Sequence, residues 1–212
     1  MTLLDLPAFY AILDPEQTAG RPVEAVLDEL LKGGTRWLQL RVKLLAPTDF
    51  FELAQRVRAH TWTRHCTLII NDRVDIALAC NADGVHLGQE DLPLAAARKL
   101  LANKIIGIST HNLAQARKAE NGGADYIGFG PLFGTSTKET GYAARGVEML
   151  RQIRSAIKIP IVAIGGITEQ NVQQVWRAGA DSAAIISDLL RADDIAGKVA
   201  RIMRQQQNGK HL

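Results

Sequence analysis

The chain alternates short apolar runs with longer amphipathic segments eight times, and this alternation limits the folds open to it. Each apolar run has the length of a buried strand, and the segments between them show helical periodicity. The expected strands are Phe9–Leu13, Trp37–Arg41, Thr67–Ile70, Gly84–Leu87, Lys104–Ile108, Tyr126–Gly128, Ile161–Ile164 and Ser182–Ile186. The expected helices are Pro22–Lys32, Pro47–His60, Val74–Ala79, Leu92–Leu101, Leu113–Asn121, Val147–Ile157, Gln170–Arg177 and a last one from about Asp194 to Arg204.

Eight consecutive strand–helix units predict an α/β protein with a single (β/α)8 TIM barrel. An open doubly wound sheet is the competing architecture. It usually carries a glycine fingerprint after its first strand, where this chain has Asp14–Gln17. The composition does not change along the chain, so we expect one domain over residues 1–212. The glutamine-rich segment 205–212 is expected to fray.

Three of the expected helix-to-strand turns have related sequences. They are Asn81–Gly84, Gly122–Asp125 and Ala178–Asp181, and each contains the pair Ala-Asp just before a strand. The turns recur at equivalent places in the strand–helix repeat, which supports the division of the chain into regular units.

Charge and hydropathy argue against several functional classes. A formal net charge of +3 is small for 212 residues and does not indicate a nucleic-acid-binding face. No apolar run approaches the ~20 residues of a membrane-spanning helix, and the first residues lack the pattern of a secretory signal. Cys66 and Cys80 have no metal-ligand spacing and are expected to be buried free thiols. We therefore expect a cytoplasmic protein that binds neither nucleic acid nor membranes.

The second expected strand alternates polar and apolar residues. Gln39, Arg41 and Lys43 alternate with apolar residues such as Leu38 and Leu40. Because successive side chains of a strand face opposite sides, the three polar side chains share one face. Burying cations without partners costs several kcal/mol, so this face indicates a site for a charged ligand. The alternative interpretation is an edge strand with one solvated face.

Polar residues collect after the expected strands rather than before them. Asn71 and Asp72 follow the third strand, Asp91 follows the fourth, Ser109 follows the fifth and Ser187 follows the eighth. In a (β/α)8 barrel the chemistry lies at the carboxyl ends of the strands. The distribution therefore predicts a functional site on that rim.

Asp72 and Asp91 end neighbouring strands, so their carboxylates can share a hard cation. Two carboxylates, completed by waters and phosphate oxygens, are a usual way for a protein to hold Mg2+. Each also has an alternative interpretation as a helix cap, Asp72 for Val74–Ala79 and Asp91 for the helix that begins at Leu92. Their occurrence together, beside the cations of the second strand, favours Mg2+.

Two glycine-containing segments indicate a second anion position. The loop Gly128–Lys138 is too long and too rich in hydroxyl groups for a tight turn, although an ordinary flexible loop is the alternative. Its Thr135, Thr137 and Lys138 can donate to phosphate oxygens. Gly165-Gly166 follows the seventh strand, and barrels frequently bind phosphate with the loops after strands seven and eight.

The histidines carry less information. His86 lies inside the expected fourth strand, and a structural histidine and a ligand contact are equally compatible with that position. The sequence contains no defensible Ser–His–Asp or Cys–His arrangement and no evident general base. We therefore expect electrostatic stabilisation, rather than proton transfer, to carry the chemistry.

In order and spacing, these segments resemble the thiamine phosphate synthase (thiamine-phosphate pyrophosphorylase) family from Tyr10 to about Leu190. The matching segments are Gln39–Lys43, Ile70–Asp72, Asp83–Asp91, Gly107–His111, Ala124–Gly128, Thr135–Lys138 and Ile161–Ile167. The resemblance implies a barrel enzyme that joins hydroxymethylpyrimidine diphosphate to a hydroxyethylthiazole phosphate. The products would be thiamine phosphate and pyrophosphate, formed by a Mg2+-assisted dissociative substitution.

The resemblance also implies a role for each matching residue. Asp72 and Asp91 would hold Mg2+. The diphosphate would be held by Arg41, Lys43, Asn71, Ser109 and Lys138. Of these, the catalytic residues would be Arg41, Lys43, Ser109 and Lys138. Gln39 would contact the pyrimidine. The thiazole phosphate would be held by Thr135, Thr137, Gly166, Ile186 and Ser187.

The chain departs from the family pattern in a few places. Gly134 stands where proline is common, which is expected to loosen the loop that follows. Asp188 follows Ser187 where a small residue is usual. An additional carboxylate is unfavourable beside a phosphate unless it turns away, so affinity for the thiazole phosphate is in question.

Two other functions remain as hypotheses. The segment Arg73–Ala77 is similar to the sister family of thiazole tautomerases, which share the barrel but lack the diphosphate and metal residues. A non-catalytic sensor of thiamine intermediates is the other hypothesis. Both are less favoured, because the carboxylates and cations of a synthase are all present. A homo-oligomer is compatible with the sequence.

Overall fold

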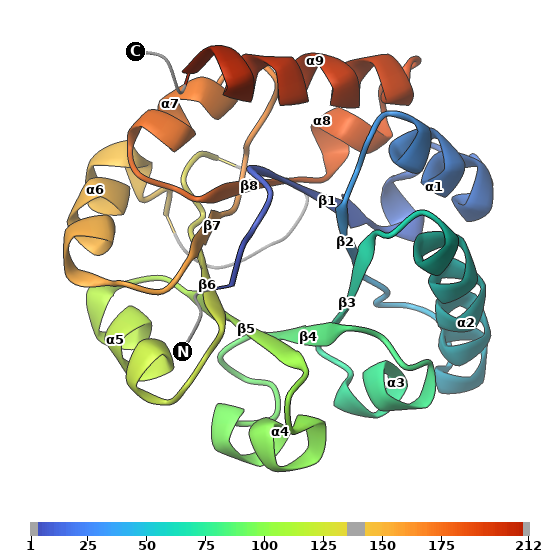
Figure 1. Ribbon diagram of the computed structural model, residues 1–212, viewed down its shortest axis with the longest axis horizontal. Coiled ribbons are helices and arrows are strands. Elements are labelled where there is room, and N and C mark those ends of the chain that lie inside the picture. The colour runs from blue at the N-terminus through green and yellow to red at the C-terminus, as the bar shows by residue number, and fades with distance from the viewer. Residues whose placement is uncertain (1–3, 135–142, 210–212) are drawn as a thin grey trace.

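Eight parallel strands close into a barrel in the computed structural model, which describes residues 4–134 and 143–209 (Figure 1). Each strand pairs with the next in the chain, and the eighth pairs with the first. The predicted (β/α)8 barrel is therefore confirmed. The strands are β1 (Phe9–Leu13), β2 (Trp37–Leu40), β3 (Thr67–Asn71), β4 (Gly84–Leu87), β5 (Ile105–Thr110), β6 (Tyr126–Phe129), β7 (Ile161–Ala163) and β8 (Ser182–Ile185).

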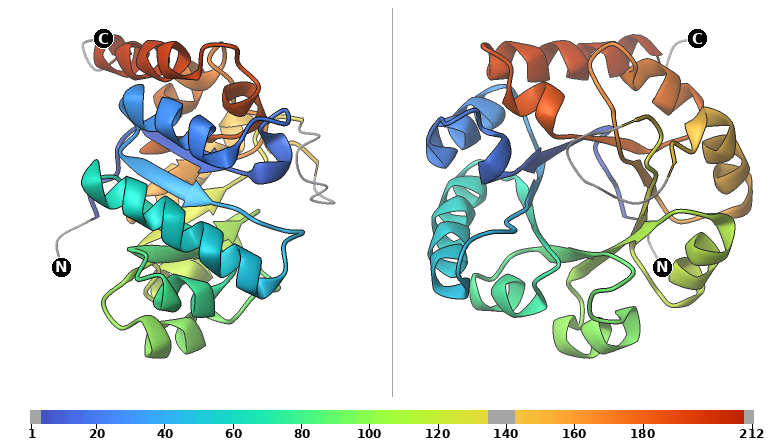
Figure 2. Two further views of the ribbon diagram at one scale, coloured as in Figure 1. Left: turned by 90° about the vertical axis from the view of Figure 1, so that its right-hand side faces the viewer. Right: turned by 180° about the vertical axis from the view of Figure 1, so that it is seen from behind.

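The helices form an outer ring around the barrel, as the two views of Figure 2 show. They are α1 (Val23–Lys32), α2 (Pro47–Thr63), α3 (Val74–Ala79), α4 (Leu94–Leu101), α5 (Leu113–Asn121), α6 (Gly146–Ala156), α7 (Val172–Arg177), α8 (Ser187–Leu190) and α9 (Ile195–Gly209). Two short elements were not predicted from the sequence, α8 and the 3-10 helix η1 (Pro15–Gln17). Each is too short for helical periodicity to be detected in the sequence.

Strand alternation divides the buried residues into two cores. Side chains such as Ala11 and Leu13 of β1 face outward and pack in the larger core with the helices. The alternate side chains of the same strand face inward. The inner cluster consists of Tyr10, Ile12, Trp37, Ile69, Tyr126, Val162 and Ala184. This inner core closes the barrel below the carboxyl ends of the strands.

The C-terminal helix is longer than the sequence predicts. The segment beginning at residue 205 was expected to fray, but α9 continues to Gly209. Its residues Ile195, Val199 and Ile202 are buried. They hold the helix against α1 and α7, which it spans along one side of the barrel (Figure 1). The helical tail thus extends a helix that is packed through its earlier residues.

Strand β5 is also longer than predicted. The sequence suggested an end at Ile108, because Ser109 and Thr110 are polar. Both belong to the strand and pair with residues of β6. The Thr110 hydroxyl donates to the Gly128 carbonyl at 3.1 Å, so its burial is compensated.

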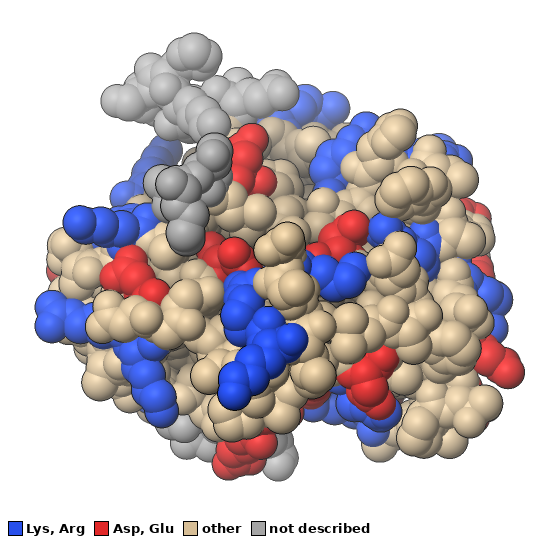
Figure 3. All heavy atoms as spheres, turned by 60° about the horizontal axis from the view of Figure 1, so that its bottom comes forward, with Lys and Arg blue, Asp and Glu red and all other residues tan. Residues whose placement is uncertain are grey.

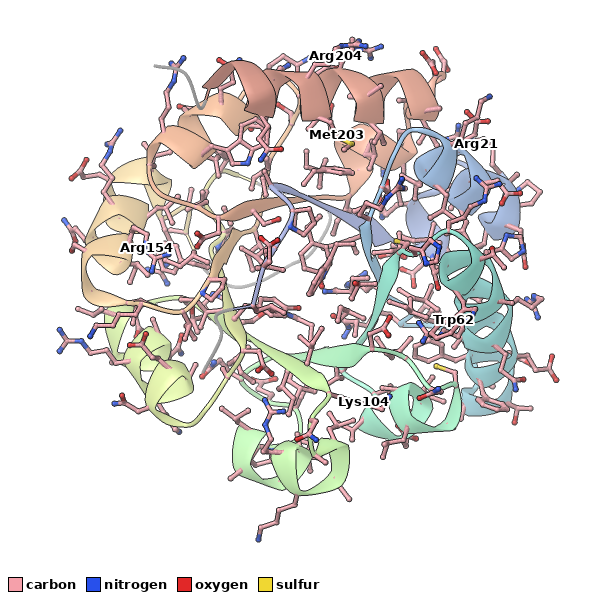
Figure 4. The ribbon with its side chains drawn as sticks, viewed as in Figure 1. Arg21, Trp62, Lys104, Arg154, Met203 and Arg204 are labelled. Atoms are coloured by element: carbon pink, nitrogen blue, oxygen red, sulfur yellow. The ribbon has the colours of Figure 1, made fainter. Side chains whose placement is uncertain are left out.

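In each of the three Ala-Asp turns, the aspartate accepts hydrogen bonds from a strand amide and from a helix arginine. Asp125 Oδ2 accepts from the Ile106 amide at 2.7 Å and from Arg98 of α4 at 2.6 Å. The same arrangement joins Asp83 to the Leu68 amide and Arg58, and Asp181 to the Ile161 amide and Arg154. Arg154 is labelled in Figure 4. We call these three sets the Arg–Asp clamps.

The clamps connect the strands in pairs. They tie β3 to β4, β5 to β6 and β7 to β8, each through a helix that precedes the pair. The position before β2 holds Arg36 instead of an aspartate. At this first pair Arg21, labelled in Figure 4, donates to the Ala192 carbonyl at 3.0 Å. The entry to α1 is thereby tied to the residues that precede α9.

The surface carries both signs of charge. Lys and Arg are interspersed with Asp and Glu over the face that Figure 3 shows, in keeping with the small net charge. None of the helices in the described parts of the chain has the length and apolar character needed to span a membrane. Cys66 and Cys80 are buried free thiols, as predicted.

Candidate active site

A cavity of about 270 Å3 lies at the carboxyl ends of the strands. Its wall includes inward-facing side chains and residues of the segments that follow β2, β5, β6, β7 and β8. Seven of the residues predicted from the sequence line it: Gln39, Arg41, Asn71, Ser109, Gly166, Ile186 and Ser187. The alternation predicted for β2 explains the first two, because Leu38 and Leu40 pack in the outer core.

The predicted metal ligands meet beside this cavity. Asp72 and Asp91 are in hydrogen-bonding contact with each other, and Lys43 forms an ion pair with Asp72. Asp91 Oδ2 also accepts from the Gly88 amide at 2.6 Å. The positions that cap α3 and α4 are Arg73 and Pro93, so neither aspartate caps the helix after it. The capping alternative is therefore wrong.

The contact between the two carboxylates is reflected in their pKa values. Burial raises the pKa of Asp91, and the neighbouring Asp72 raises it further. Burial also acts upward on the pKa of Asp72. The hydrogen bond with Asp91 and the Lys43 ammonium outweigh burial, so that pKa is lowered overall. Two adjacent carboxylates that cannot both ionise freely fit a hard divalent cation such as Mg2+, which relieves their repulsion.

Asp14 is a site residue that the sequence analysis did not select. It follows β1, its side chain is fully buried, and it forms an ion pair with Arg41. It also accepts from the Glu16 amide at 3.0 Å. A carboxylate at the carboxyl end of β1 is on the same rim as the residues that were selected. That position was the signal that could have revealed it.

The loop after β7 brings bare main chain to the cavity. Gly165 and Gly166 have φ values of +87° and +66°, which favour glycine. A Cβ atom on Gly166 would lie 2.6 Å from the Gly134 carbonyl oxygen. Main-chain amides without side chains can approach a ligand closely. With Ser187 and Ile186, this wall lies across the barrel from β3 and β4 (Figure 1).

The additional carboxylate, Asp188, is compensated. Its Oδ1 lies 2.8 Å from Lys198 Nζ of α9, and its Oδ2 accepts from the Glu169 amide at 3.0 Å. Asp188 still lines the cavity. Asp188 is therefore paired with a lysine ten positions later, whose charge opposes that of the aspartate.

Other cavity residues were not selected from the sequence. Tyr10 and Ile12 come from β1, His86 from β4, and His111 follows β5. The tyrosine and the isoleucine were assigned only to an apolar strand, because periodicity does not separate a barrel interior from an outer core. The predicted residues Thr135, Thr137 and Lys138 lie outside the described residues.

The fold and this distribution of charge define a class of protein: (β/α)8 barrels that bind anionic small molecules at the carboxyl ends of their strands. Comparison with known proteins narrows the class. The model of the family described as thiamine monophosphate synthase matches residues 9–189, and the chain belongs to this family.

Individual relatives agree with the family match. The chain is 44% identical to the thiamine-phosphate synthase of Chloroflexus aurantiacus, over 91% of this chain and 89% of that protein. It is 46% identical to the enzyme of the same name from Syntrophomonas wolfei, over 93% and 95%. Among solved structures, the thiamine phosphate pyrophosphorylase from Pyrococcus furiosus has a TM-score of 0.87 and 33% identity, with 96% and 97% coverage.

Proposed function

We propose that the protein is a thiamine phosphate synthase. It joins 4-amino-2-methyl-5-hydroxymethylpyrimidine diphosphate to a hydroxyethylthiazole phosphate, and it releases pyrophosphate as thiamine phosphate forms. The observation that carries the proposal is one cavity with two chemically different walls. One wall has Arg41, Asn71 and Ser109, with Lys43 and the paired carboxylates beside it, for a diphosphate with its metal. The other wall has a glycine turn for a monophosphate.

The first wall would bind and orient the diphosphate. Arg41 and Lys43 would neutralise its negative charge, and Asn71 and Ser109 would hold its oxygens by hydrogen bonds. Gln39, buried in the same cavity, would orient the pyrimidine. A preorganised set of such groups stabilises charge as it develops on the leaving pyrophosphate, which is where electrostatic catalysis is most effective.

Asp72 and Asp91 would hold Mg2+. When bound, the ion supplies further neutralisation of the diphosphate charge. The contact between the two carboxylates supports this assignment. Because Lys43 lies beside Asp72, the lysine that would bind the diphosphate and the carboxylates that would bind Mg2+ form one cluster.

The second wall would place the thiazole phosphate. Gly166, Ile186 and Ser187 would hold it so that the thiazole nitrogen faces the pyrimidine methylene carbon. The bond from that carbon to the diphosphate oxygen breaks, and its electron pair leaves with pyrophosphate. The nitrogen lone pair then forms the new carbon–nitrogen bond. No proton is removed to form this bond, so the reaction needs no general base.

Three residues complete the proposal on the family resemblance. Thr135 and Thr137 would hold the thiazole phosphate, and Lys138 would contact the diphosphate. Because Lys138 would oppose charge that grows during the reaction, Lys138→Ala should slow turnover more than it weakens binding of the thiazole phosphate.

The decisive experiment measures pyrophosphate release from the pyrimidine diphosphate. The purified protein is assayed with and without the thiazole phosphate, in Mg2+ and in EDTA. The proposal expects release, with thiamine phosphate as the second product, only when both the thiazole phosphate and Mg2+ are present. Asp72→Asn and Asp91→Asn should lose this activity while the protein stays folded.

The competing functions give different results in the same assay. A thiazole tautomerase would isomerise a thiazole phosphate without any diphosphate. A sensor would bind the two ligands and release no pyrophosphate. Either result from correctly folded protein would refute the proposed function.

A further inference from the structure

Five polar side chains from five different strands form a continuous hydrogen-bonded series inside the barrel. Barrel interiors are usually filled by branched apolar residues, so a buried polar series there is unusual and costs desolvation. All five side chains are buried. In order along the series they are Gln39 (β2), Tyr10 (β1), Tyr126 (β6), His86 (β4) and Ser109 (β5). We call this set the interior polar chain.

Each link of the interior polar chain has the length of a good hydrogen bond. Gln39 Nε2 lies 2.9 Å from Tyr10 Oη, which lies 3.0 Å from Tyr126 Oη. His86 Nδ1 lies 3.0 Å from Tyr126 Oη, and His86 Nε2 lies 2.8 Å from Ser109 Oγ. Both ends of the chain line the cavity, whereas Tyr126 is not among its lining residues.

The strands are shaped to hold the rings of this chain. A Cβ atom on Gly107 of β5 would lie 2.0 Å from Tyr126 Cζ. A Cβ atom on Gly128 of β6 would lie 2.9 Å from His86 Cε1. The two rings themselves are stacked, with centroids 5.5 Å apart. The absence of side chains at these two positions therefore makes room for the middle of the chain.

Counting hydrogens gives the chain a direction. Burial raises the pKa of Tyr10 to about 12 and that of Tyr126 well above 10, so both are neutral phenols with one hydrogen each. Tyr10 accepts from the Gln39 amide, which leaves its own hydrogen for Tyr126. The Tyr126 hydrogen then goes to His86 Nδ1. A neutral His86 consequently carries its hydrogen on Nε2 and donates to Ser109.

We propose that Tyr10, Tyr126 and His86 are positioning residues that set the hydrogen-bonding roles at both ends of the chain. With His86 Nε2 donating to Ser109 Oγ, the serine hydrogen turns away from His86 and is directed at an anionic ligand oxygen. With Gln39 Nε2 donating to Tyr10, the amide presents Oε1 as an acceptor for a ligand amino group. Identification of the two ligand groups rests on the proposed function, but the direction of the chain does not.

The direction can be measured without activity. Long-range proton–nitrogen NMR distinguishes the two neutral tautomers of histidine, and the His86 signals are assigned by their loss in His86→Gln. The proposal expects the tautomer with hydrogen on Nε2 in the wild-type protein at neutral pH. Hydrogen on Nδ1 alone would reverse the direction, and a doubly protonated ring would donate from both nitrogens and leave the chain without one direction. Either result would overturn the inference. This result stands whether or not the protein makes thiamine phosphate.

The effect on function is measured with Tyr126→Phe. This change removes one buried hydroxyl and keeps the ring, and the residue does not line the cavity. We expect loss of the tautomer preference of His86 and a fall in kcat of about tenfold, smaller than the ~100-fold cost of removing a direct donor. The KM for the thiazole phosphate should stay within about twofold, because that ligand is bound by other residues.

Trp37→Phe is the matched control. Trp37 packs edge-on against both Tyr10 and Tyr126, with ring centroids 6.0 Å and 6.3 Å apart, but it is not a link of the chain. Trp37→Phe removes more buried volume than Tyr126→Phe. If the interior residues acted only through packing, Trp37→Phe would be the more harmful variant. Equal or larger loss of kcat in Trp37→Phe would refute the positioning role. Wild-type kcat in this control, with the fall in Tyr126→Phe, would support it.

Discussion

At the scale of single residues, two charged side chains that line the cavity are each held by an oppositely charged residue that does not line it. Arg41 is paired with the fully buried Asp14, which fixes the guanidinium at the rim. Asp188 is paired with Lys198, whose charge opposes that of the carboxylate beside the proposed phosphate position. Buried or half-buried charges of this kind are costly when they lose a partner, so the partners determine the electrostatics of the cavity.

Gly166→Ala tests whether the glycine turn forms the phosphate wall. The new Cβ would meet the Gly134 carbonyl oxygen at 2.6 Å, so the main chain must shift at the cavity. We expect KM for the thiazole phosphate to rise about tenfold, a loss of about 1.4 kcal/mol. Steady-state kinetics with the pyrimidine diphosphate saturating would measure this change.

Gly20→Ala is the control for backbone strain. Gly20 also has a positive φ, +77°, but a Cβ there has no heavy atom within 4 Å. Gly20→Ala should lose about 1 kcal/mol of stability in urea, because alanine disfavours this conformation, and Gly166→Ala should lose at least as much, because its Cβ also meets the main chain. Only Gly166→Ala should change KM. A similar KM in both variants would argue against a phosphate wall at Gly166.

Lys198→Met tests the compensation of Asp188. Removing the lysine leaves a carboxylate uncompensated beside the proposed phosphate position, so KM for the thiazole phosphate should rise at least several-fold, about 1 kcal/mol. Adding Asp188→Asn removes the repulsive charge and should restore KM. Non-additivity in this double-mutant cycle is the measured quantity, and additive effects would show that the two residues act separately.

At the scale of elements, the three Arg–Asp clamps hold neighbouring strands in pairs. Each carboxylate accepts from a strand amide and from a helix arginine together, so it satisfies a backbone group as well as a charge. Their positions are at the opposite end of the strands from the cavity. They belong to the stability of the barrel rather than to its chemistry.

Asp125→Ala should destabilise the protein without changing its activity. It leaves the Ile106 amide and the Arg98 guanidinium without their acceptor, which should cost about 1–3 kcal/mol in urea denaturation. Glu148→Ala removes only an exposed ion pair with Arg151 and should cost less than about 0.5 kcal/mol. Equal losses in the two variants would contradict a role for the backbone amide.

The elements were predictable from the sequence because barrel strands and helices have clear periodicities and turn residues. The residues at which elements end were less predictable. Polar Ser109 and Thr110 looked like a loop, although a buried strand accepts polar residues that have hydrogen-bond partners. Ser109 bonds to His86 and Thr110 to the Gly128 carbonyl. The tail of α9 looked unstructured because it is polar, yet the helix continues through it from a part whose buried residues are Ile195, Val199 and Ile202.

The site was predictable where residues end strands, since that position alone places them on one rim. Gln39, Arg41, Asn71 and Ser109 reach the cavity for this reason. The interior polar chain was not predictable, because Tyr10 and Tyr126 are typical strand residues. Whether a strand tyrosine faces the helices or the barrel axis depends on the register of closure.

At the scale of the whole molecule, burial of titratable groups makes stability depend on pH at the alkaline end. Burial raises the pKa of the Cys66 thiol from 9.0 to about 12. The stability that this group contributes is complete below pH 9, where the unfolded thiol is also protonated. It is lost as pH rises from 9 to 12, because only the unfolded chain then releases the proton.

Cys66→Ala should therefore flatten the alkaline stability curve. Between pH 9 and 10 the free energy of unfolding of the wild type should fall by about 1 kcal/mol more than that of the variant. Urea denaturation at several pH values measures the slope, which is independent of the packing lost at neutral pH. Parallel curves for the two proteins would contradict the burial of this thiol.

The eight strands form a closed ring, and the Arg–Asp clamps tie three of its four consecutive strand pairs. Each clamp takes its arginine from the helix before its strand pair, and for β1 and β2 that helix around the ring is α9, from the other end of the chain. Among the described residues, β1 and β2 are therefore the strand pair without an Arg–Asp clamp, because Arg36 stands at the aspartate position before β2. In a circularly permuted chain opened between Arg58 and Asp83, the clamp that these two residues form would have to join the segments that carry the new termini.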